Sequence, residues 1–246
     1  MQSLIDYQLA GSVATISMDD GKVNALSLGM INEINQALDQ AQDNAAVIVL
    51  AGRAGVFSAG FDLPVLRAGG PAATSMLRAG FDLAERLLSY SRPIVIACTG
   101  HAVAMGAFLL LAGDYRVGTA GPYKITANEV AIGLTMPRAA VELCRQRLTP
   151  AHFNRATILA EPYQPDSAIE AGFLDRACDP ADFWDVVEGI AAELAKLDPD
   201  AHTATKLRVR QAALAAVHDA IATDHAALTW RDLAAAAAAT ADARSA

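Results

Sequence analysis

Short apolar runs separated by turn-forming residues open the chain. Two such runs, residues 4–9 and 13–18, flank Ala10-Gly11-Ser12 and predict a β-hairpin. Ser27 precedes apolar residues at helical spacing, so we expect it to cap a helix that extends to Asp39. A hairpin followed by an amphipathic helix is therefore the expected start of the fold.

Fully apolar runs and helical patterns alternate farther along. Residues 47–50 and 94–97 predict buried strands, and residues 72–89 and 106–112 predict helices. The glycine-bearing stretch 52–70 is expected to be a loop. This alternation predicts an α/β fold in which helical crossovers join the strands of a sheet.

The second half of the chain becomes progressively helical. We expect one core over residues 1–180 and a C-terminal helical lobe over residues 181–246, broken near 197–200. The remaining expected elements of the core are strands near 115–117 and 123–126 and helices near 138–147 and 151–160.

One uncharged stretch, residues 93–113, is long enough to cross a bilayer. It begins with a β-type run and passes through the polar turn Cys98-Thr99-Gly100-His101 before the helical pattern, so a buried strand, turn and helix explain it better. Residues 1–9 contain Asp6 and lack the basic and apolar regions of a signal peptide. We therefore expect a cytoplasmic protein that does not act in a membrane.

Charge and composition exclude several classes of protein. The chain has 246 residues with 19 Lys and Arg against 27 Asp and Glu, a formal net charge of −8, which argues against nucleic-acid binding. With 53% hydrophobic and 19% charged residues it is too apolar for intrinsic disorder. Its cysteines, Cys98, Cys144 and Cys178, lie far apart without ligand spacing, so neither a disulfide framework nor a metal site is expected.

Glycine-rich segments follow several of the apolar runs. They cover residues 57–63, 100–107 and 128–133. Small residues let backbone N–H groups approach a ligand closely, and the N-terminus of a helix offers unpaired donors. Two such segments facing each other would form an oxyanion hole.

These segments, taken with others in the same order, resemble the crotonase superfamily of enoyl-CoA hydratases and isomerases. Together they cover about residues 1–180, and their combination is specific although each alone is weak. The motifs are Lys22-Val23-Asn24-Ala25-Leu26, Phe57-Ser58-Ala59-Gly60-Phe61-Asp62-Leu63, Gly100-His101-Ala102-Val103-Ala104-Met105-Gly106, Gly113-Asp114-Tyr115-Arg116, Asn128-Glu129-Val130-Ala131-Ile132-Gly133-Leu134 and Ala168-Ile169-Glu170-Ala171-Gly172-Phe173-Leu174.

The resemblance implies a crotonase-like spiral of ββα units with a C-terminal helical lobe for trimerisation. Its ligand would be an acyl-CoA thioester, which is the substrate, with no separate cofactor. The backbone N–H groups of Phe61 and Met105 would hold the thioester oxygen, and Glu129 would act as the base. The residues implied to line the substrate site are Lys22, Asn24, Ala25, Ala59, Gly60, Asp62, Leu63, Gly106 and Phe108, with Lys22 and Arg67 as candidate partners of the CoA phosphates.

The chain departs from the hydratase pattern at three places, one of which is the segment Met136-Pro137-Arg138-Ala139-Ala140, without the glycine cluster common after Pro in hydratases. Hydratases carry two glutamates, but alignment places Phe108 at the first position and leaves only Glu129. Hydration needs a held water and a proton donor, whereas moving a double bond needs one base. The expected activity is thus that of a Δ3,Δ2-enoyl-CoA isomerase. Met105 is a further departure, because glycine is usual at that position. The alternatives to isomerase activity are a hydratase-like lyase acting on an unidentified acyl-CoA and a silent acyl-CoA-binding homologue.

Structural interpretations of the same residues remain open at this stage. Glu129 is compatible with a solvated strand end and Phe108 with simple core packing. Ser58, His101 and Asp62 do not form the GxSxG elbow of a serine hydrolase. The other structural alternatives are a buried histidine for His101, a turn cap for Asp62, a structural role for Asp114 and an oligomer contact for residues 228–231. A homotrimer or a dimer of trimers is expected, because the apolar C-terminal helices need a surface on which to pack.

Overall fold

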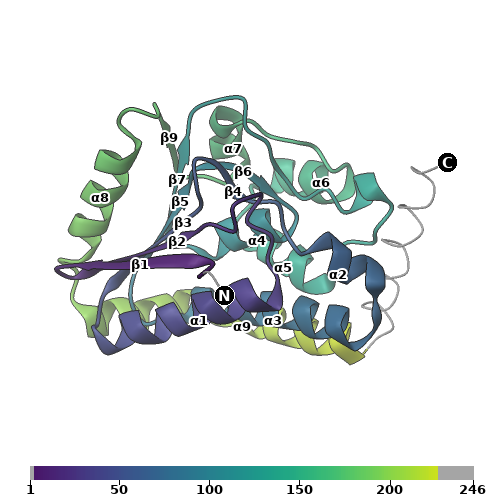
Figure 1. Ribbon diagram of the computed structural model, residues 1–246, viewed down its shortest axis with the longest axis horizontal. Coiled ribbons are helices and arrows are strands. Elements are labelled where there is room, and N and C mark those ends of the chain that lie inside the picture. The colour runs from purple at the N-terminus through teal and green to yellow at the C-terminus, as the bar shows by residue number, and fades with distance from the viewer. Residues whose placement is uncertain (1–2, 227–246) are drawn as a thin grey trace.

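A six-stranded sheet runs through the centre of the computed structural model, which describes residues 3–226 (Figure 1). The first two strands form the predicted antiparallel hairpin, and every later pairing is parallel. In spatial order the strands are β1 (Ile5–Ala10), β2 (Val13–Met18), β3 (Val47–Ala51), β5 (Ile94–Cys98), β7 (Tyr115–Thr119) and β9 (Arg176–Cys178).

A second, smaller parallel sheet lies beside the first and is built from the strands that follow β3, β5 and β7 in sequence. Each turn of the chain therefore supplies one strand to the large sheet, the next strand to the small sheet, and then helical structure. This repetition confirms the expected spiral of ββα units. The small sheet consists of β4 (Gly55–Ser58), β6 (Gly100–Val103) and β8 (Ile125–Thr126).

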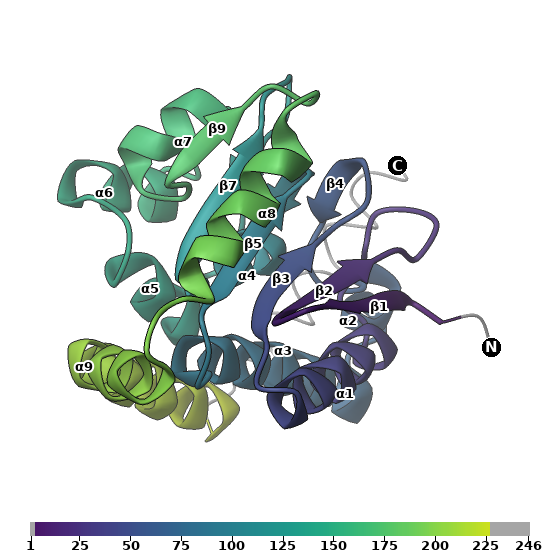
Figure 2. The same ribbon diagram turned by 90° about the vertical axis from the view of Figure 1, so that its left-hand side faces the viewer.

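Helices cover both faces of the large sheet. α8 lies across one face of this sheet (Figure 2). Along β3, Val47, Val49 and Ala51 belong to the cluster that packs under α8, whereas Ile48 and Leu50 belong to the main core. Burial on both faces explains why this strand is apolar throughout. The helices are α1 (Leu28–Asp43), α2 (Leu63–Ala68), α3 (Gly70–Ser89), α4 (Met105–Ala112), α5 (Arg138–Arg145), α6 (Pro150–Ile158), α7 (Pro165–Ala171), α8 (Phe183–Leu194) and α9 (Pro199–Ala226), with the 3-10 turn η1 (Val130–Ile132).

The C-terminal helices lie directly on the core. α8 packs across β3, β5 and β7, and α9 runs beneath α3 and α5 (Figures 1 and 2). The predicted helix cap is present, since Ser27 Oγ accepts a hydrogen bond from Met30 N at 3.2 Å. The expected break near residues 197–200 separates α8 from α9.

Two expectations of irregular structure were wrong. The stretch 52–70 contains β4 and α2, and the supposed turn at residues 98–101 leads directly into β6. Glycines make these strands weak in isolation. Here, however, backbone packs on backbone, since a Cβ on Gly100 would lie 2.0 Å from Gly55 C. Neither α7 nor β9 was among the elements expected from the sequence.

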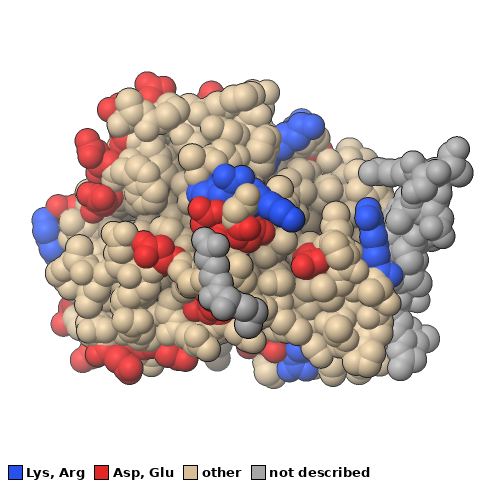
Figure 3. Space-filling model, viewed as in Figure 1, with Lys and Arg blue, Asp and Glu red and all other residues tan. Residues whose placement is uncertain are grey.

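Acidic side chains gather along one side and the lower edge of the face in Figure 3, whereas Lys and Arg form small separate groups there. This distribution agrees with the formal net charge of −8. Within residues 3–226, no helix is both long and apolar enough to span a membrane. The expected oligomer contact at 228–231 lies outside the described residues.

Candidate active site

A pocket of about 300 Å³ opens where the small sheet meets α2, α3 and α4. Five of the residues singled out by the sequence analysis as a site line it: Ala59, Phe61, Leu63, Phe108 and Glu129. Arg67, the candidate phosphate partner, lies on the same wall and is exposed. The other lining residues are Leu66, Leu77, Phe81, Val103, Ala104, Asn128, Ile132, Leu134 and Pro137.

The first backbone donor comes from the turn between β4 and α2. Gly60 has φ +89°, a left-handed conformation that favours glycine, and its carbonyl accepts a 2.8 Å hydrogen bond from Leu26 N. Asp62 then caps α2, because its side chain accepts from Val65 N at 3.2 Å. The N–H of Phe61, between Gly60 and Asp62, takes part in none of the loop and cap hydrogen bonds found among the described residues.

The second donor lies at the start of α4. Ala104 has φ +50°, uncommon for a residue with a Cβ, and Met105 begins the helix, where backbone N–H groups have no helical acceptor. The two turns touch, since a Cβ on Gly60 would lie 3.2 Å from Met105 N. The Met105 side chain is only 1% exposed and packs in the main core, so it does not obstruct the pocket.

Glu129 is the acidic residue among those that line the pocket. It follows β8 immediately before η1, is 6% exposed, and its Oε2 has no hydrogen-bond partner among the described residues. Burial raises the pKa of this carboxyl group from 4.5 to about 7. A carboxyl group with such a pKa both accepts and returns a proton near neutral pH.

Aromatic rings form the wall near Glu129. The rings of Phe81 and Phe108 stack with centroids 6.3 Å apart, and Phe61 lies 6.1 Å from Phe81. Gly80 makes room for this arrangement, since a Cβ there would lie 2.3 Å from the Phe61 ring. The wall is apolar and close-packed, so it disfavours the charged form of Glu129.

Other residues expected at the site lie outside the pocket lining. Asn24 is fully buried, and its side chain donates to the carbonyl oxygens of Met18 and Phe57 at 2.9 and 3.1 Å. Lys22 is exposed and Ala25 half-buried, on the loop before α1. Gly106 faces β4 rather than open space, because a Cβ there would lie 2.4 Å from Ser58 O.

Sequence reasoning missed several lining residues. Phe81 and Leu77 lie on the buried stripe of α3, and helical spacing alone assigns such positions to the core. Asn128 belongs to a recognised motif, and its Oδ1 is buried without a partner among the described residues. Its position beside Glu129 was the available signal.

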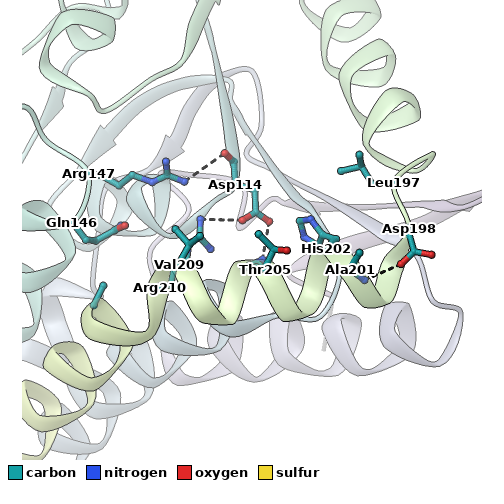
Figure 4. Close-up of a pocket in the computed structure, with 12 residues that line it drawn as sticks. Asp114, Gln146, Arg147, Leu197, Asp198, Ala201, His202, Thr205, Val209 and Arg210 are labelled. Carbon is teal, nitrogen blue, oxygen red and sulfur yellow. Dashed lines mark hydrogen bonds and ion pairs between the residues drawn. The ribbon is translucent and has the colours of Figure 1, made fainter.

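A larger pocket, about 580 Å³, lies at the first turns of α9 (Figure 4). The charged groups of this pocket form ion pairs with one another, since Asp114 pairs with Lys206 Nζ at 2.7 Å and with Arg210 Nη2 at 2.9 Å. Arg147 and Arg210 also donate to Gly113 O, at the C-terminal end of α4. These cations satisfy helix carbonyls, so the cluster is structural, as expected for Asp114.

Residues 8–230 match the family described as Enoyl-CoA hydratase/isomerase. A probable enoyl-CoA hydratase from Mycobacterium avium is 28% identical over 165 residues, which cover 66% of this chain. The match spans 64% of the length of that relative.

Solved structures extend the similarity over nearly the whole fold. A Pseudomonas syringae protein described as belonging to the enoyl-CoA hydratase/isomerase family is 44% identical with a TM-score of 0.89, covering 90% of this chain and 96% of that one. A Mycobacterium tuberculosis protein, described in one solved structure as an enoyl-CoA isomerase and in another as a probable enoyl-CoA hydratase, is 48% identical with a TM-score of 0.88, and the first of these structures covers 92% of this chain and 99% of that one. The chain belongs to the enoyl-CoA hydratase/isomerase family of the crotonase superfamily.

Proposed function

We propose that this protein is a Δ3,Δ2-enoyl-CoA isomerase with Glu129 as its single acid–base residue. The observation that carries the proposal is the unpaired, buried carboxyl group of Glu129 in a pocket where an aromatic ring, Phe108, stands in place of a second carboxylate. A water molecule to be added across a C=C bond needs both a holder and a proton donor. Proton transfer along an acyl chain needs only one group that accepts and then donates.

The reaction follows from the arrangement of donors and base. Glu129 removes a proton from C2 of a 3-enoyl thioester, and the electron pair of the broken C–H bond forms the C1=C2 bond of a dienolate as negative charge moves onto the thioester oxygen. The N–H groups of Phe61 and Met105 stabilise this negative charge, an effect worth about 3–4 kcal/mol per donor in comparable sites. Protonated Glu129 then delivers the proton to C4, which moves the double bond to C2=C3 and re-forms the thioester carbonyl, so no atom is gained or lost.

The remaining parts of the proposal concern binding and assembly. The CoA thioester is the substrate and no separate cofactor takes part, with Lys22 and Arg67 as partners of the CoA phosphates. The protein acts in the cytoplasm as a homotrimer or a dimer of trimers, which light scattering measures directly. The Mycobacterium tuberculosis relative is described both as an enoyl-CoA isomerase and as a probable enoyl-CoA hydratase, and the first of these descriptions supports isomerase chemistry.

Product analysis tests the activity. The protein is incubated separately with a 3-enoyl-CoA and a 2-enoyl-CoA, and the products are separated by chromatography and weighed by mass spectrometry. We expect the two isomers to interconvert with unchanged mass. Formation of 3-hydroxyacyl-CoA from 2-enoyl-CoA at a typical hydratase rate would favour the lyase alternative, and absence of turnover with retained binding would favour a silent homologue.

A further inference from the structure

Ser58, the last residue of β4, lies at the contact between the two turns that carry the proposed oxyanion donors. Its side chain is fully buried and does not line the pocket. On one side, its Oγ accepts a hydrogen bond from Gly60 N at 3.1 Å. This bond fixes the backbone immediately before Phe61, the first donor.

The same hydroxyl group is anchored from the opposite side. Ser58 Oγ donates to Asn24 O at 2.7 Å, so Ser58 holds Gly60 at a fixed place relative to residue 24. Asn24 has φ +52°, and this strained backbone is held because its side chain spans from Met18 O to Phe57 O. The anchor point is therefore rigid.

Asp20 makes this anchor tighter. Its carboxylate accepts from the backbone N–H groups of Lys22, Asn24 and Ala25, each at 2.8 Å. Burial opposes ionisation of Asp20, but these hydrogen bonds together outweigh it and hold its pKa below the ordinary value. The charged carboxylate of Asp20 thus fixes the loop of residues 20–25, and the Asn24 carbonyl of this loop accepts the hydrogen bond from Ser58 Oγ.

Ser58 also contacts the second donor turn. A Cβ on Gly106 would lie 2.4 Å from Ser58 O and 2.9 Å from Ser58 Cβ, so the first turn of α4 rests on this residue. β4 and β6, which lead into the two turns, pair side by side (Figure 1). One buried side chain therefore touches both backbone turns.

We infer that Ser58 is a positioning residue that sets the separation and direction of the Phe61 and Met105 N–H groups. This inference rests on the proposed function, because it assumes that these groups bind the thioester oxygen. Misplacement of a catalytic group by about 1 Å can cost about 100-fold in rate. Loss of the Ser58 hydroxyl should therefore affect the polarised thioester much more than the binding of CoA.

The test measures the infrared stretch of a carbonyl-labelled, saturated acyl-CoA bound to the full-length protein. Hydrogen bonds to the oxygen lower this frequency, and a saturated chain is not turned over. We expect a clear downshift in the wild type, its partial loss in Ser58→Ala, and an intermediate value in Ser58→Cys, whose thiol is a weaker hydrogen-bonding group. With substrate, Ser58→Ala should lower kcat about 10- to 100-fold and leave KM within a few-fold.

Thr99→Val is the matched control. Thr99 is also buried, and its hydroxyl donates at 3.2 Å to Val56 O of β4, the strand that ends at Ser58. This hydrogen bond lies away from both donor turns. It should lower thermal stability while leaving the downshift and kcat unchanged. An unshifted carbonyl in the wild type would overturn the oxyanion hole itself. An equal downshift in wild type and Ser58→Ala, with stability loss like that of Thr99→Val, would overturn only the role of Ser58.

Discussion

Glu129 keeps one carboxyl oxygen without a hydrogen-bond partner in residues 3–226, inside a pocket whose walls are mostly apolar. Burial of an ionised carboxylate destabilises the folded state, and the rise in the pKa of Glu129 to about 7 reflects that free-energy cost. The same pKa shift lets the carboxyl group accept and donate a proton near neutral pH. The burial that destabilises the charged form of Glu129 therefore also suits it to the proposed isomerisation.

Glu129→Gln should abolish turnover while binding of acyl-CoA stays within a few-fold. The amide preserves the shape of the side chain but cannot accept the proton, and loss of general-base catalysis costs about 10²–10⁴ in rate. Steady-state kinetics and calorimetry measure the two quantities. Glu188→Gln, on the exposed side of α8, is the control. Wild-type turnover in Glu129→Gln would leave Glu129 with a structural role only.

Comparison with Glu129→Gln should also reveal that Glu129 lowers the stability of the wild type in a pH-dependent way. Because folding raises the pKa of Glu129 from 4.5 to about 7, the folded state binds a proton that the unfolded state has lost between those values. Wild-type stability therefore falls as pH rises through this window, by at most about 1.4 kcal/mol per pH unit. Glutamine does not titrate, so the advantage of Glu129→Gln in thermal unfolding should grow from pH 5 to pH 8. A constant difference would contradict a raised pKa.

At the scale of elements, α4 links the sheet to the pocket through close backbone contact. Gly106→Ala should displace the first turn of α4 from β4, because the new Cβ would lie 2.4 Å from Ser58 O. We expect lower kcat and lower thermal stability. Gly189→Ala is the comparison, since nothing lies within 4 Å of its added Cβ in α8, and alanine there should stabilise by up to about 1 kcal/mol. Equal effects of the two substitutions would exclude a tight α4–β4 contact.

Phe108 in α4 is expected to influence the choice of reaction. Its ring is 1% exposed, stacks on Phe81 and lines the pocket with Glu129. Phe108→Glu should reduce stability and introduce weak hydratase activity, since two neighbouring carboxyl groups can hold and activate water. The measurement is 3-hydroxyacyl-CoA formed from 2-enoyl-CoA, with Phe108→Leu as an apolar control. Equal hydration by both variants would remove Phe108 as the determinant.

Elements were predictable where their own side chains determine them. β3 and β5 are apolar on both faces, and α1 and α3 have clear helical stripes, so each was recognised from the sequence. β4 and β6 were not, because both are short and begin with a glycine, and only the folded structure shows that a Cβ on Gly100 of β6 would lie 2.0 Å from Gly55 C of β4. Glu129 was likewise found through its motif, whereas its wall residue Phe81 depends on how α3 packs against α4, which no local pattern specifies.

At the scale of the whole molecule, α9 supports the walls of the site from below. It packs along α3, which carries Phe81, and along α5, which follows Pro137 of the pocket. At its far end, fully buried Asp224 accepts from Ala139 N at 3.1 Å and pairs with Arg138. The pocket thus depends on a helix that contributes no lining residue to it.

Asp114 holds the N-terminal half of α9 against the core through ion pairs. Its substitution tests whether the pocket depends on α9. Its carboxylate accepts from Ile94 N at 2.8 Å and pairs with Lys206, which joins β5, β7 and α9. It also pairs with Arg210 of α9 (Figure 4). Asp114→Asn keeps the shape but leaves buried cations without a counter-charge, a change that costs about 3–5 kcal/mol. The expected fall in the midpoint of thermal unfolding is about 10 °C.

Lys206 makes the effect of Asp114→Asn depend on pH. Burial lowers the pKa of Lys206 to about 8 despite the opposing charge of Asp114, and loss of that charge lowers it further. Above pH 8 the lysine is neutral in both folded proteins, so its share of the penalty disappears, and the deficit in unfolding temperature should be smaller at pH 9 than at pH 7. Asp82→Asn, which breaks an exposed pair with Arg78, should cost under about 1 kcal/mol at both pH values. If the two variants unfolded at the same temperature, the Asp114 cluster would not be what holds α9 against the core.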